Sequence, residues 1–400
     1  MAFQQTLSGR RRVELIIILG ALTTFGAMSI DMYLPALPAI AREFHTSIGQ
    51  AENTMATFFL GFAIGQLFFG PMADRFGRRP PLFFGLLFYL LMCIGCALSV
   101  SVDMLMTARF FQAVGACAGG VVARACVRDI FGPEETPRIF AYMSLVLSVA
   151  PLFAPFLGGY LLIWASWRAI FWFQFGIGAL ATIATALRLP ETHGGVHRRL
   201  HPVVIVADYW RILRDREFTA YALAGAVSNA SLYAYLTGSP HVFIDMFHVA
   251  PQNFGWFFAI NAIGLIGTAQ IAARLVHGRL PERIMLIAQF AHVGASALLI
   301  VISLTELGGV YGLGASLFLF LSCNGAINPM SAGASMRHYA VNAGMASALL
   351  GTLIFAIGFA VSLLMGVIPA ATPFVLASVM AGCAVAGLAI HLLLKPEQAH

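Results

Sequence analysis

Apolar runs of about twenty residues recur along nearly the whole chain, and they constrain the fold more than any other feature. A helix of roughly 20 apolar residues spans the hydrocarbon core of a bilayer. Inside lipid every backbone N–H and C=O must be paired within the protein, so such runs form helices. The sequence therefore predicts an all-α integral membrane protein with twelve transmembrane helices. The twelve runs are residues 14–37, 50–71, 80–100, 103–123, 138–161, 168–188, 218–238, 253–273, 284–304, 309–331, 343–364 and 371–393.

The composition excludes the main soluble alternatives. Only 10% of the 400 residues are charged and 60% are apolar, whereas a soluble domain carries roughly 25% charged residues. A disordered chain, a nucleic-acid-binding surface and a secreted disulfide scaffold each need more polarity or a cysteine framework. The six cysteines lie in or beside apolar runs, so we expect them to be packing thiols. The expected partners are the lipid bilayer and a small-molecule substrate, with no nucleic acid, and we expect a monomer.

The distribution of cations predicts the orientation in the membrane. Twelve spans place both termini on one side, and the side richer in lysine and arginine is the cytoplasmic one. Nearly all of the 23 lysines and arginines fall in the connections on the side of the termini. Only Arg42 and Arg168 lie in connections on the other side, and Arg109 lies within a span. We therefore expect both termini in the cytoplasm.

The longest polar stretch, residues 189–217, divides the chain into two halves. Residues 1–188 are predicted to form an N-terminal six-helix bundle and residues 218–400 a C-terminal one, joined by a cytoplasmic linker. Two bundles that rock about a central cavity are typical of transporters built from repeated halves.

The linker contains three histidines at intervals of four residues, His193, His197 and His201. On one helix they would share a face and suggest a metal site. The glycines at 194 and 195 oppose a helix there, so we expect a solvated basic linker and no metal.

Two charges are predicted to lie inside the first bundle, Asp31 in span one and Arg109 in span four. Charged side chains within a span are costly and mark function. A helical rise of 1.5 Å per residue places them about 7 and 9 Å below the outer surface. A carboxyl group whose surroundings alternate between an arginine and a dry wall can load and release a proton. We therefore expect Asp31 and Arg109 to be the proton-coupling residues.

Each of these two charges has a structural alternative. Asp31 precedes Pro35 and Pro38 and could cap backbone amides at a helix end. Arg109 could brace the bundle through backbone carbonyls.

Neutral polar and aromatic side chains inside the spans suit an adaptable cavity for drug-sized ligands, because a few hydrogen bonds set the orientation of such a ligand. The alternative for each residue is a hydrogen bond from helix to helix. The predicted cavity residues are Tyr33, Phe62, Gln66, Gln112, Asn229, Tyr233, Tyr235, Asn261, Asn324 and Asn328.

The segment between spans two and three, GPMADRFGRR, is the most specific motif of the chain. Glycine permits tight turning at a helix end, and Asp74 can pair with an arginine in a latch that is made in one state and broken in another. The segment is similar to the signature loop of the major facilitator superfamily. This resemblance assigns a gating role to Gly70, Asp74, Arg75, Gly77 and Arg78.

Span five carries two prolines and two adjacent glycines, Pro151, Pro155, Gly158 and Gly159. It resembles the motif of the drug/proton antiporters of this superfamily, with alanines where glycines are usual. Together with SIDMYLPALP at 29–38 and ARACVRDI at 123–130, the chain resembles the Bcr/CflA branch of bicyclomycin- and chloramphenicol-resistance exporters. The resemblance implies proton-coupled efflux of small drugs across the bacterial inner membrane, with the proton as coupling ion and no other cofactor.

A proton-coupled exporter of a metabolite, such as an amino acid or a dipeptide, would use the same residues. The sequence does not separate these two functions. An intramembrane enzyme would need a catalytic or metal cluster at one depth, and His292 within a span has no obvious carboxylate partner. We therefore expect a transporter and not an enzyme.

Overall fold

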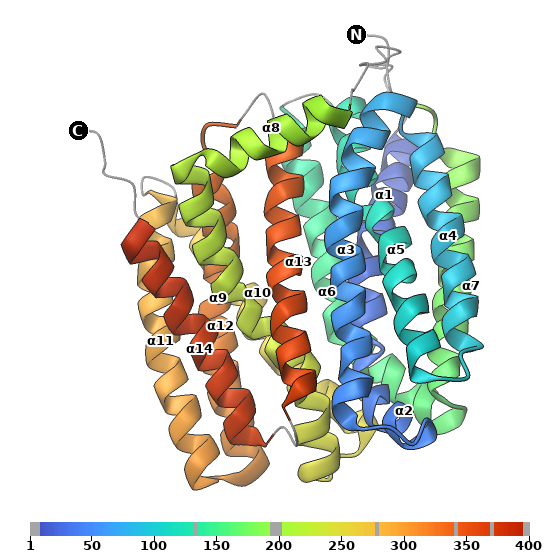
Figure 1. Cartoon of the computed structure of the whole chain (residues 1–400). Helices are drawn as coiled ribbons and strands as arrows, with labels where there is room; N and C mark the ends of the chain where they lie inside the picture. The colour runs from blue at the N-terminus through green and yellow to red at the C-terminus, as the bar shows by residue number, and fades with distance from the viewer. Residues whose placement is uncertain are drawn as a thin grey trace.

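The computed structural model describes residues 9–131, 134–192, 202–276, 280–339, 343–368 and 372–394. Helices account for nearly all of the described chain, and the long ones run side by side across one slab (Figure 1). The described parts of α1 and α14 begin and end, respectively, at the same end of the slab, where the short helix α8 also lies. We call this the α8 end and the opposite one, where α2 lies, the α2 end.

In the described part of the chain, twelve long helices coincide with the twelve predicted spans. The first six are α1 (Gly9–Asp31), α3 (Ile48–Phe76), α4 (Arg79–Ala97), α5 (Val102–Ile130), α6 (Thr136–Trp164) and α7 (Trp167–Arg188). The last six are α9 (Arg216–Pro240), α10 (Pro251–Leu275), α11 (Pro281–Thr305), α12 (Gly309–Ser335), α13 (Ala343–Val367) and α14 (Pro373–Leu394). The prediction of an all-α, twelve-helix membrane protein is confirmed.

The helix α9 is more polar than the other long helices. Eleven described helices are long and apolar enough to cross a membrane, and α9 is not among them. Its buried residues include Ser228, Asn229, Ser231, Thr237 and Ser239. Because these side chains face protein and not lipid, α9 can span the slab with a lower hydropathy.

The first predicted span is not one straight helix. The helix α1 ends at Asp31, and the chain continues through the 3-10 turn η1 (Leu34–Ala36) into the short helix α2 (Leu37–Glu43). Pro35 and Pro38 explain the break, since proline lacks an N–H and disfavours helical backbone in the residue before it.

The predicted loop between spans two and three is mostly helical. The helix α3 runs through Pro71 to Phe76, so only Gly77 and Arg78 separate it from α4. Gly77 has a φ of 89°, a left-handed backbone that glycine adopts without strain. The turn is therefore shorter than its motif suggested, and the motif's acid lies on a helix.

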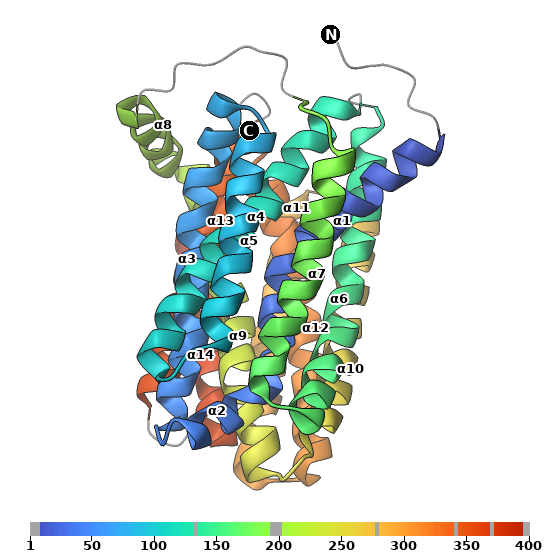
Figure 2. The same ribbon diagram turned by 90° about the vertical axis from the view of Figure 1, so that its right-hand side faces the viewer.

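The long helices form two bundles of six, with α1 and α3–α7 in one and α9–α14 in the other (Figures 1 and 2). The bundles meet where α3 packs on α13 and α6 packs on α10. The helix α8 (Pro202–Arg214) follows the first bundle and precedes the second in the sequence, and it runs across the α8 end of the slab. The domain limits 1–188, 189–217 and 218–400 stay a prediction.

The three linker histidines, His193, His197 and His201, lie outside the described residues. Within the described ranges no group of three or more His, Cys, Asp or Glu side chains is placed to hold a metal ion.

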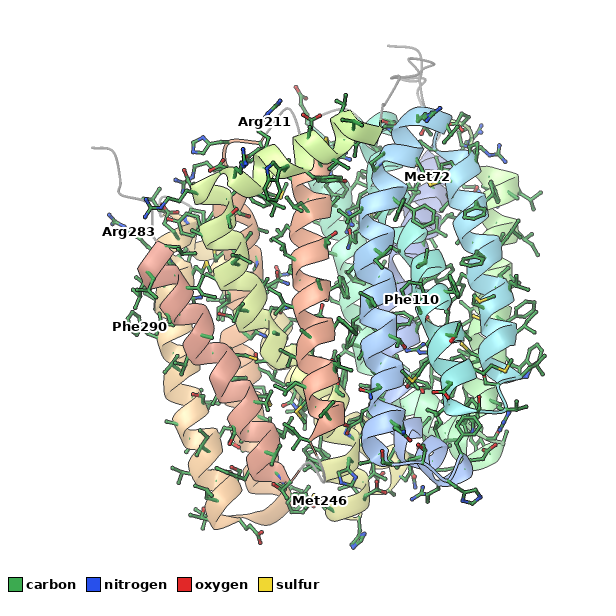
Figure 3. The ribbon with its side chains drawn as sticks, in the orientation of Figure 1. Met72, Phe110, Arg211, Met246, Arg283 and Phe290 are labelled. Carbon is green, nitrogen blue, oxygen red and sulfur yellow. The ribbon has the colours of Figure 1, made fainter. Side chains whose placement is uncertain are left out.

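Apolar side chains cover the outer surface of both bundles (Figure 3). Phe290 on α11, for example, is 55% exposed. Arg211 and Arg283 lie at the α8 end. A soluble protein rarely exposes so large an apolar surface, whereas a bilayer covers it.

Candidate functional site

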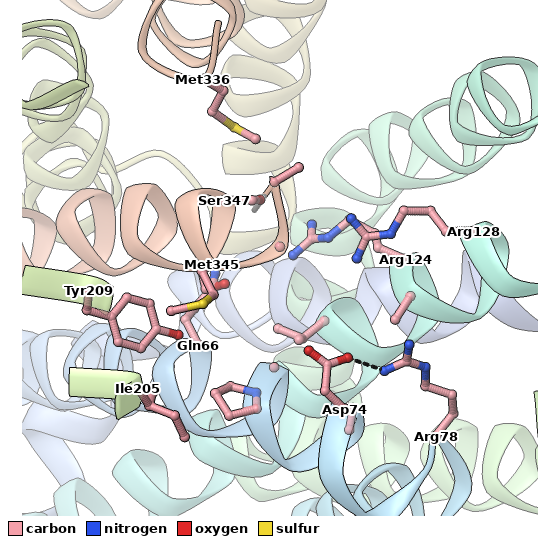
Figure 4. A pocket seen from close by; sticks show the side chains of 18 of the residues that line it. Gln66, Asp74, Arg78, Arg124, Arg128, Ile205, Tyr209, Met336, Met345 and Ser347 are labelled. Carbon is pink, nitrogen blue, oxygen red and sulfur yellow. Dashed lines mark hydrogen bonds and ion pairs between the residues drawn. The ribbon is translucent and has the colours of Figure 1, made fainter. Parts of the chain in front are cut away.

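A cavity of about 550 Å³ opens between the two bundles near the α8 end. Figure 4 shows its walls, to which α3, α5, α8 and α13 contribute Gln66, Arg124, Tyr209 and Ser347, respectively. The cavity has the size of a site for a small molecule.

The opposite end, near α2, is closed by close helix contacts. A Cβ atom on Gly49 of α3 would overlap the carbonyl oxygen of Gly366 on α13. Across the same seam Arg42 pairs with Asp245 at 3.4 Å, and Asp245 also contacts Nδ1 of His241 at 3.0 Å. Asp245 therefore takes part in an ion pair between the bundles.

Aromatic rings fill the interface in the middle of the slab. Phe62 of α3 lies 4.5 Å from Phe355 of α13, and Phe59 lies 4.7 Å from Tyr233 of α9, measured between ring centroids. Gln66, one turn from Phe62, lines the cavity and lies against Gly351 of α13. These rings therefore separate the cavity from the closed α2 end.

Arg109 lies inside the first bundle with none of its surface exposed. Its guanidinium carbon is 4.3 and 4.2 Å from the ring centroids of Tyr33 and Phe58. Nη1 donates to the carbonyl oxygen of Ser29 at 3.0 Å and to Oε1 of Gln112 at 2.8 Å. Two aromatic faces and two oxygen acceptors thus stabilise the charge in place of a carboxylate.

The hydrogen bond to Ser29 follows from the break in α1. Tyr33 N donates to Ile30 O at 3.1 Å, as in a 3-10 turn, so the carbonyl of Ser29 lacks its usual partner four residues on. Carbonyls at a helix end need an outside donor. Arg109 supplies one and ties the end of α1 to α5, so the bracing alternative describes its contacts.

Gln112 extends this network across the bundle. Its amide nitrogen donates to Oε1 of Gln174 on α7 at 3.0 Å. Tyr33 donates or accepts a hydrogen bond of 2.7 Å with Thr54 of α3. Both residues were predicted to line the cavity, and both serve instead as contacts within the first bundle.

Asp31, the last residue of α1, is 5% exposed. It forms no ion pair with Arg109, and no hydrogen bond of its side chain is found among the described residues. The turn η1, which follows Asp31 closely in the chain, packs against α9 and α10 of the second bundle. The expected pairing of Asp31 with Arg109 is therefore absent from this conformation, because the arginine points into its own bundle.

Of the ten predicted cavity residues, only Gln66 lines the cavity at the α8 end. Tyr235 accepts a hydrogen bond from Asn261 at 3.0 Å, so this pair joins α9 to α10. Asn328 is exposed. The remaining polar predictions, Asn229, Tyr233 and Asn324, are buried inside the protein. In this conformation these side chains pack in the closed part of the interface or within a bundle, and their role in binding a substrate stays a prediction.

The gating motif forms a cluster around Arg78 at the α8 end. Arg78 pairs with Asp74 and with Asp129 of α5, each at 2.6 Å. Burial acts to lower the pKa of Arg78, but the hydrogen bonds and charges of Asp129 and Asp74 outweigh burial and raise that pKa. Arg78 therefore stays charged and holds α3 against α5.

Glu191 completes this cluster from the segment after α7. Its carboxylate accepts hydrogen bonds from the backbone N–H groups of Arg78 at 2.8 Å and Arg79 at 3.0 Å. N–H groups at the start of a helix such as α4 have no acceptor within the helix itself, so Glu191 supplies one. The other predicted members, Gly70 and Arg75, make no such contact, and Arg75 stacks on Phe76 at 5.0 Å. Asp129 belongs to the stretch ARACVRDI and Glu191 follows the sixth span, but the sequence did not indicate that either residue meets Arg78.

The proline–glycine motif of α6 lies at the α2 end. A Cβ atom on Gly158 would overlap the carbonyl oxygen of Met32, just past the end of α1. Gly159 lies against Pro251 at the start of α10 in the other bundle. Pro151 and Pro155 lie within α6. The motif thus lets α6 contact both bundles closely where the cavity is closed.

Two buried groups were missed or left open by the sequence. Glu52 of α3 is 1% exposed, and its Oε1 atom has no hydrogen-bond partner among the residues that the structure describes. It lies near the start of α3, a helix against which both α2 and α13 pack. His292 of α11 is also buried with both ring nitrogens unpartnered.

Comparison with known proteins identifies the family. The sequence matches the Major Facilitator Superfamily over residues 19–363. The chain belongs to the major facilitator superfamily. It is therefore a multi-pass membrane transporter of the bacterial type, which acts on a small molecule.

Relatives within the superfamily agree with the predicted branch. The chain is 34% identical to the uncharacterised MFS-type transporter YdgK of Bacillus subtilis, over 90% of each chain. It is 30% identical to a bicyclomycin resistance protein homologue of Haemophilus influenzae, over 86% of each chain. It is also 30% identical to a chloramphenicol resistance protein of Pseudomonas aeruginosa, over 76% of this chain and 72% of that one. The resemblance to the Bcr/CflA branch is confirmed.

Solved structures of superfamily members share the fold. A peptide transporter POT in complex with sulfate has a TM-score of 0.76 at 16% identity, over 98% of this chain and 95% of that one. The xylose transporter XylE from E. coli, in a partially occluded inward-open conformation, has a TM-score of 0.75 at 12% identity over 98% and 99%. At these identities the likeness shows the fold alone.

Proposed function

We propose that the chain is a proton-coupled multidrug efflux transporter that exports small drug-like molecules by alternating access. One observation carries the proposal: the interface between the bundles is open as a cavity at the α8 end and closed at the α2 end. A single central passage that opens at one end at a time is what alternating access requires. The bicyclomycin and chloramphenicol resistance relatives give the proposed substrate class.

The proposed orientation places the α8 end in the cytoplasm of a bacterial inner membrane, with both termini there. Arginines at this end, including Arg211 and Arg283, support it through the positive-inside rule. The cavity then faces the cytoplasm and takes substrate from inside the cell. We propose a monomer that needs no cofactor other than the coupling proton.

Asp31 is the proposed proton carrier. It is a buried carboxyl group at the end of α1, close to the turn η1 that packs on α9 and α10, so we expect rocking of the second bundle to change its surroundings. In the closed arrangement, where water is excluded, a neutral carboxylic acid has a lower free energy than a carboxylate. Opening of the α2 end to water favours the carboxylate. Arg109 is proposed to act indirectly, by fixing the end of α1 that carries Asp31.

The test is efflux from a bacterial host that lacks its own drug exporters. The unmodified chain should raise resistance to part of a drug panel, and a proton uncoupler should abolish the accompanying efflux. Asp31→Asn should bind the same drugs but lose uptake into everted vesicles driven by a pH gradient. Full proton-coupled transport by Asp31→Asn at normal expression would contradict the assignment of Asp31 as the proton carrier.

The same panel includes amino-acid and dipeptide analogues, because a metabolite exporter would use the same scaffold. Efflux of those analogues with no resistance to any drug would replace the drug-export proposal by the metabolite one. Arg211→Gln, an exposed change on α8, serves as the expression-matched control.

A further inference from the structure

Two arginines in the mouth of the cavity have no counter-ion in the part of the chain that the structure describes. Arg124 and Arg128 lie one helical turn apart on α5, and both line the cavity. Neither takes part in an ion pair or a hydrogen bond within the described residues, whereas Arg78 beside them pairs with two carboxylates. Figure 4 shows both side chains extending into the space in front of α13. Two like charges on one helix face repel each other, and here the positive charge of Arg128 disfavours the positive charge of Arg124.

The facing wall on α13 supplies no carboxylate to neutralise these charges, and Asp74, which also lines the cavity, is paired with Arg78 at 2.6 Å. The helix α13 contains no acidic residue in Ala343–Val367. Arg128 reaches this wall, because a methyl group placed on Gly344 would lie 3.9 Å from its Nη2 atom. Closing the cavity against α13 would remove water from both guanidinium groups, and burial of unpaired charge is costly. An anion that arrives with the ligand would remove that cost.

Neutral donors complete the mouth of the cavity. Ser347 of α13 and Tyr209 of α8 line it, and the buried Tyr209 hydroxyl has no hydrogen-bond partner within the described ranges. Burial, together with the negative charge of Asp74, raises the pKa of Tyr209 to about 12. The phenol therefore keeps its proton and can donate to an acceptor.

We propose that Arg124 and Arg128 form an anion-binding subsite that takes a carboxylate, sulfonate or phosphate group. The planar guanidinium group binds such oxyanions through paired hydrogen bonds. The inference rests on the proposed function and narrows its substrate class to anionic or zwitterionic small molecules. The same chemistry would also hold the phosphate of an anionic lipid that enters the mouth from the membrane.

The test compares two probes of one shape, 2-naphthoate and its neutral amide, 2-naphthamide, binding to the purified full chain in nanodiscs. The unmodified protein should bind the anion more tightly than the amide. The double variant Arg124→Gln with Arg128→Gln should weaken naphthoate binding by about tenfold or more, since bonds to charged groups are lost. Naphthamide binding should stay within about twofold, because no charged bond is lost. Equal affinities of the two probes for the unmodified protein, or equal weakening of both by the double variant, overturn the inference.

The matched controls separate charge from folding. Arg124→Lys with Arg128→Lys keeps both charges and should retain a preference for the anion, whereas Arg211→Gln on α8 should bind both probes as the unmodified protein does. If Arg211→Gln lost the preference for naphthoate, that preference would come from general surface charge and the proposed subsite would be contradicted.

Lipid composition distinguishes the two sources of the anion. If the natural occupant is a lipid phosphate, nanodiscs of equal parts phosphatidylcholine and phosphatidylglycerol should weaken naphthoate binding relative to phosphatidylcholine alone. Equal binding in both assigns the subsite to a soluble anion. Binding is measured without transport, so a chain that binds naphthoate but exports no drug would refute the proposed function and leave the subsite standing.

Discussion

At the scale of the residue, Arg109 shows how a charge is kept inside a membrane bundle without a carboxylate. Its guanidinium group lies between Tyr33 and Phe58 and donates to Ser29 and Gln112. Planarity and several donors in a fixed fork are required for this arrangement, and lysine has neither. The site therefore selects for arginine by geometry as well as by charge.

We expect Arg109→Lys to destabilise the protein more than Arg109→Gln, by about 1–2 kcal/mol in the free energy of unfolding. Lysine keeps a buried charge but loses ring stacking and paired donation, whereas glutamine carries no charge to bury. Both variants should lose transport, because the end of α1 is no longer held. Thermal unfolding of the purified variants measures the order, and a lysine variant as stable as the unmodified protein would contradict it.

The second prediction at this scale concerns the two carboxylates of Arg78. The side chain of Asp129 is 22% exposed and that of Asp74 is 56% exposed. Ion pairs near solvent contribute about 0–1 kcal/mol, while a charge left buried and unpaired costs more. Asp129→Asn should therefore lower thermal stability more than Asp74→Asn. The reverse order in paired melting experiments would show that burial does not set the strength of this cluster.

At the scale of the element, close backbone approach decides how the helices close the α2 end. Gly158 of α6 lies against the carbonyl of Met32, and Gly49 of α3 lies against that of Gly366. A side chain at either position would force the helices apart. These glycines therefore fix helix spacing at the closed seam.

Gly158→Ala should destabilise the protein by about 1–3 kcal/mol, the usual cost of overpacking. Gly176→Ala is the matched control, since it makes the same change in α7 and a Cβ atom there meets nothing within 4 Å. Alanine favours a helix over glycine by about 1 kcal/mol, so Gly176→Ala should stabilise. Equal melting temperatures for the two variants would mean that the close approach carries no energy.

At the scale of the whole molecule, the two ends of the interface differ in kind. The α2 end is held by backbone contacts and by the ion pair of Arg42 with Asp245. The α8 end has a cavity whose walls come from both bundles. Exchange between two such arrangements is the motion that rocking bundles perform.

A covalent link between the bundles at the α2 end should stop this exchange. The double variant Arg42→Cys with Asp245→Cys, treated with a short bis-methanethiosulfonate reagent that forms a disulfide with each cysteine and releases sulfinate, should lose most transport but keep substrate binding from the α8 end. Each single variant treated alike is the control and should keep transport. Undiminished transport by the fully linked protein would rule out opening at this seam.

The sequence by itself determined the membrane class, the twelve helices and the family, because apolar run length and local motifs are properties of short segments. It located Asp31, Arg109 and the gating motif for the same reason. Only the tertiary structure decided partners: Arg109 binds Ser29 and not Asp31, and Asp129 and Glu191 converge on Arg78. It also showed that most of the predicted cavity residues do not line the cavity in this conformation, because they lie in contacts between helices. Such contacts depend on helix rotation and on which end of the interface is closed, and a one-dimensional pattern specifies neither.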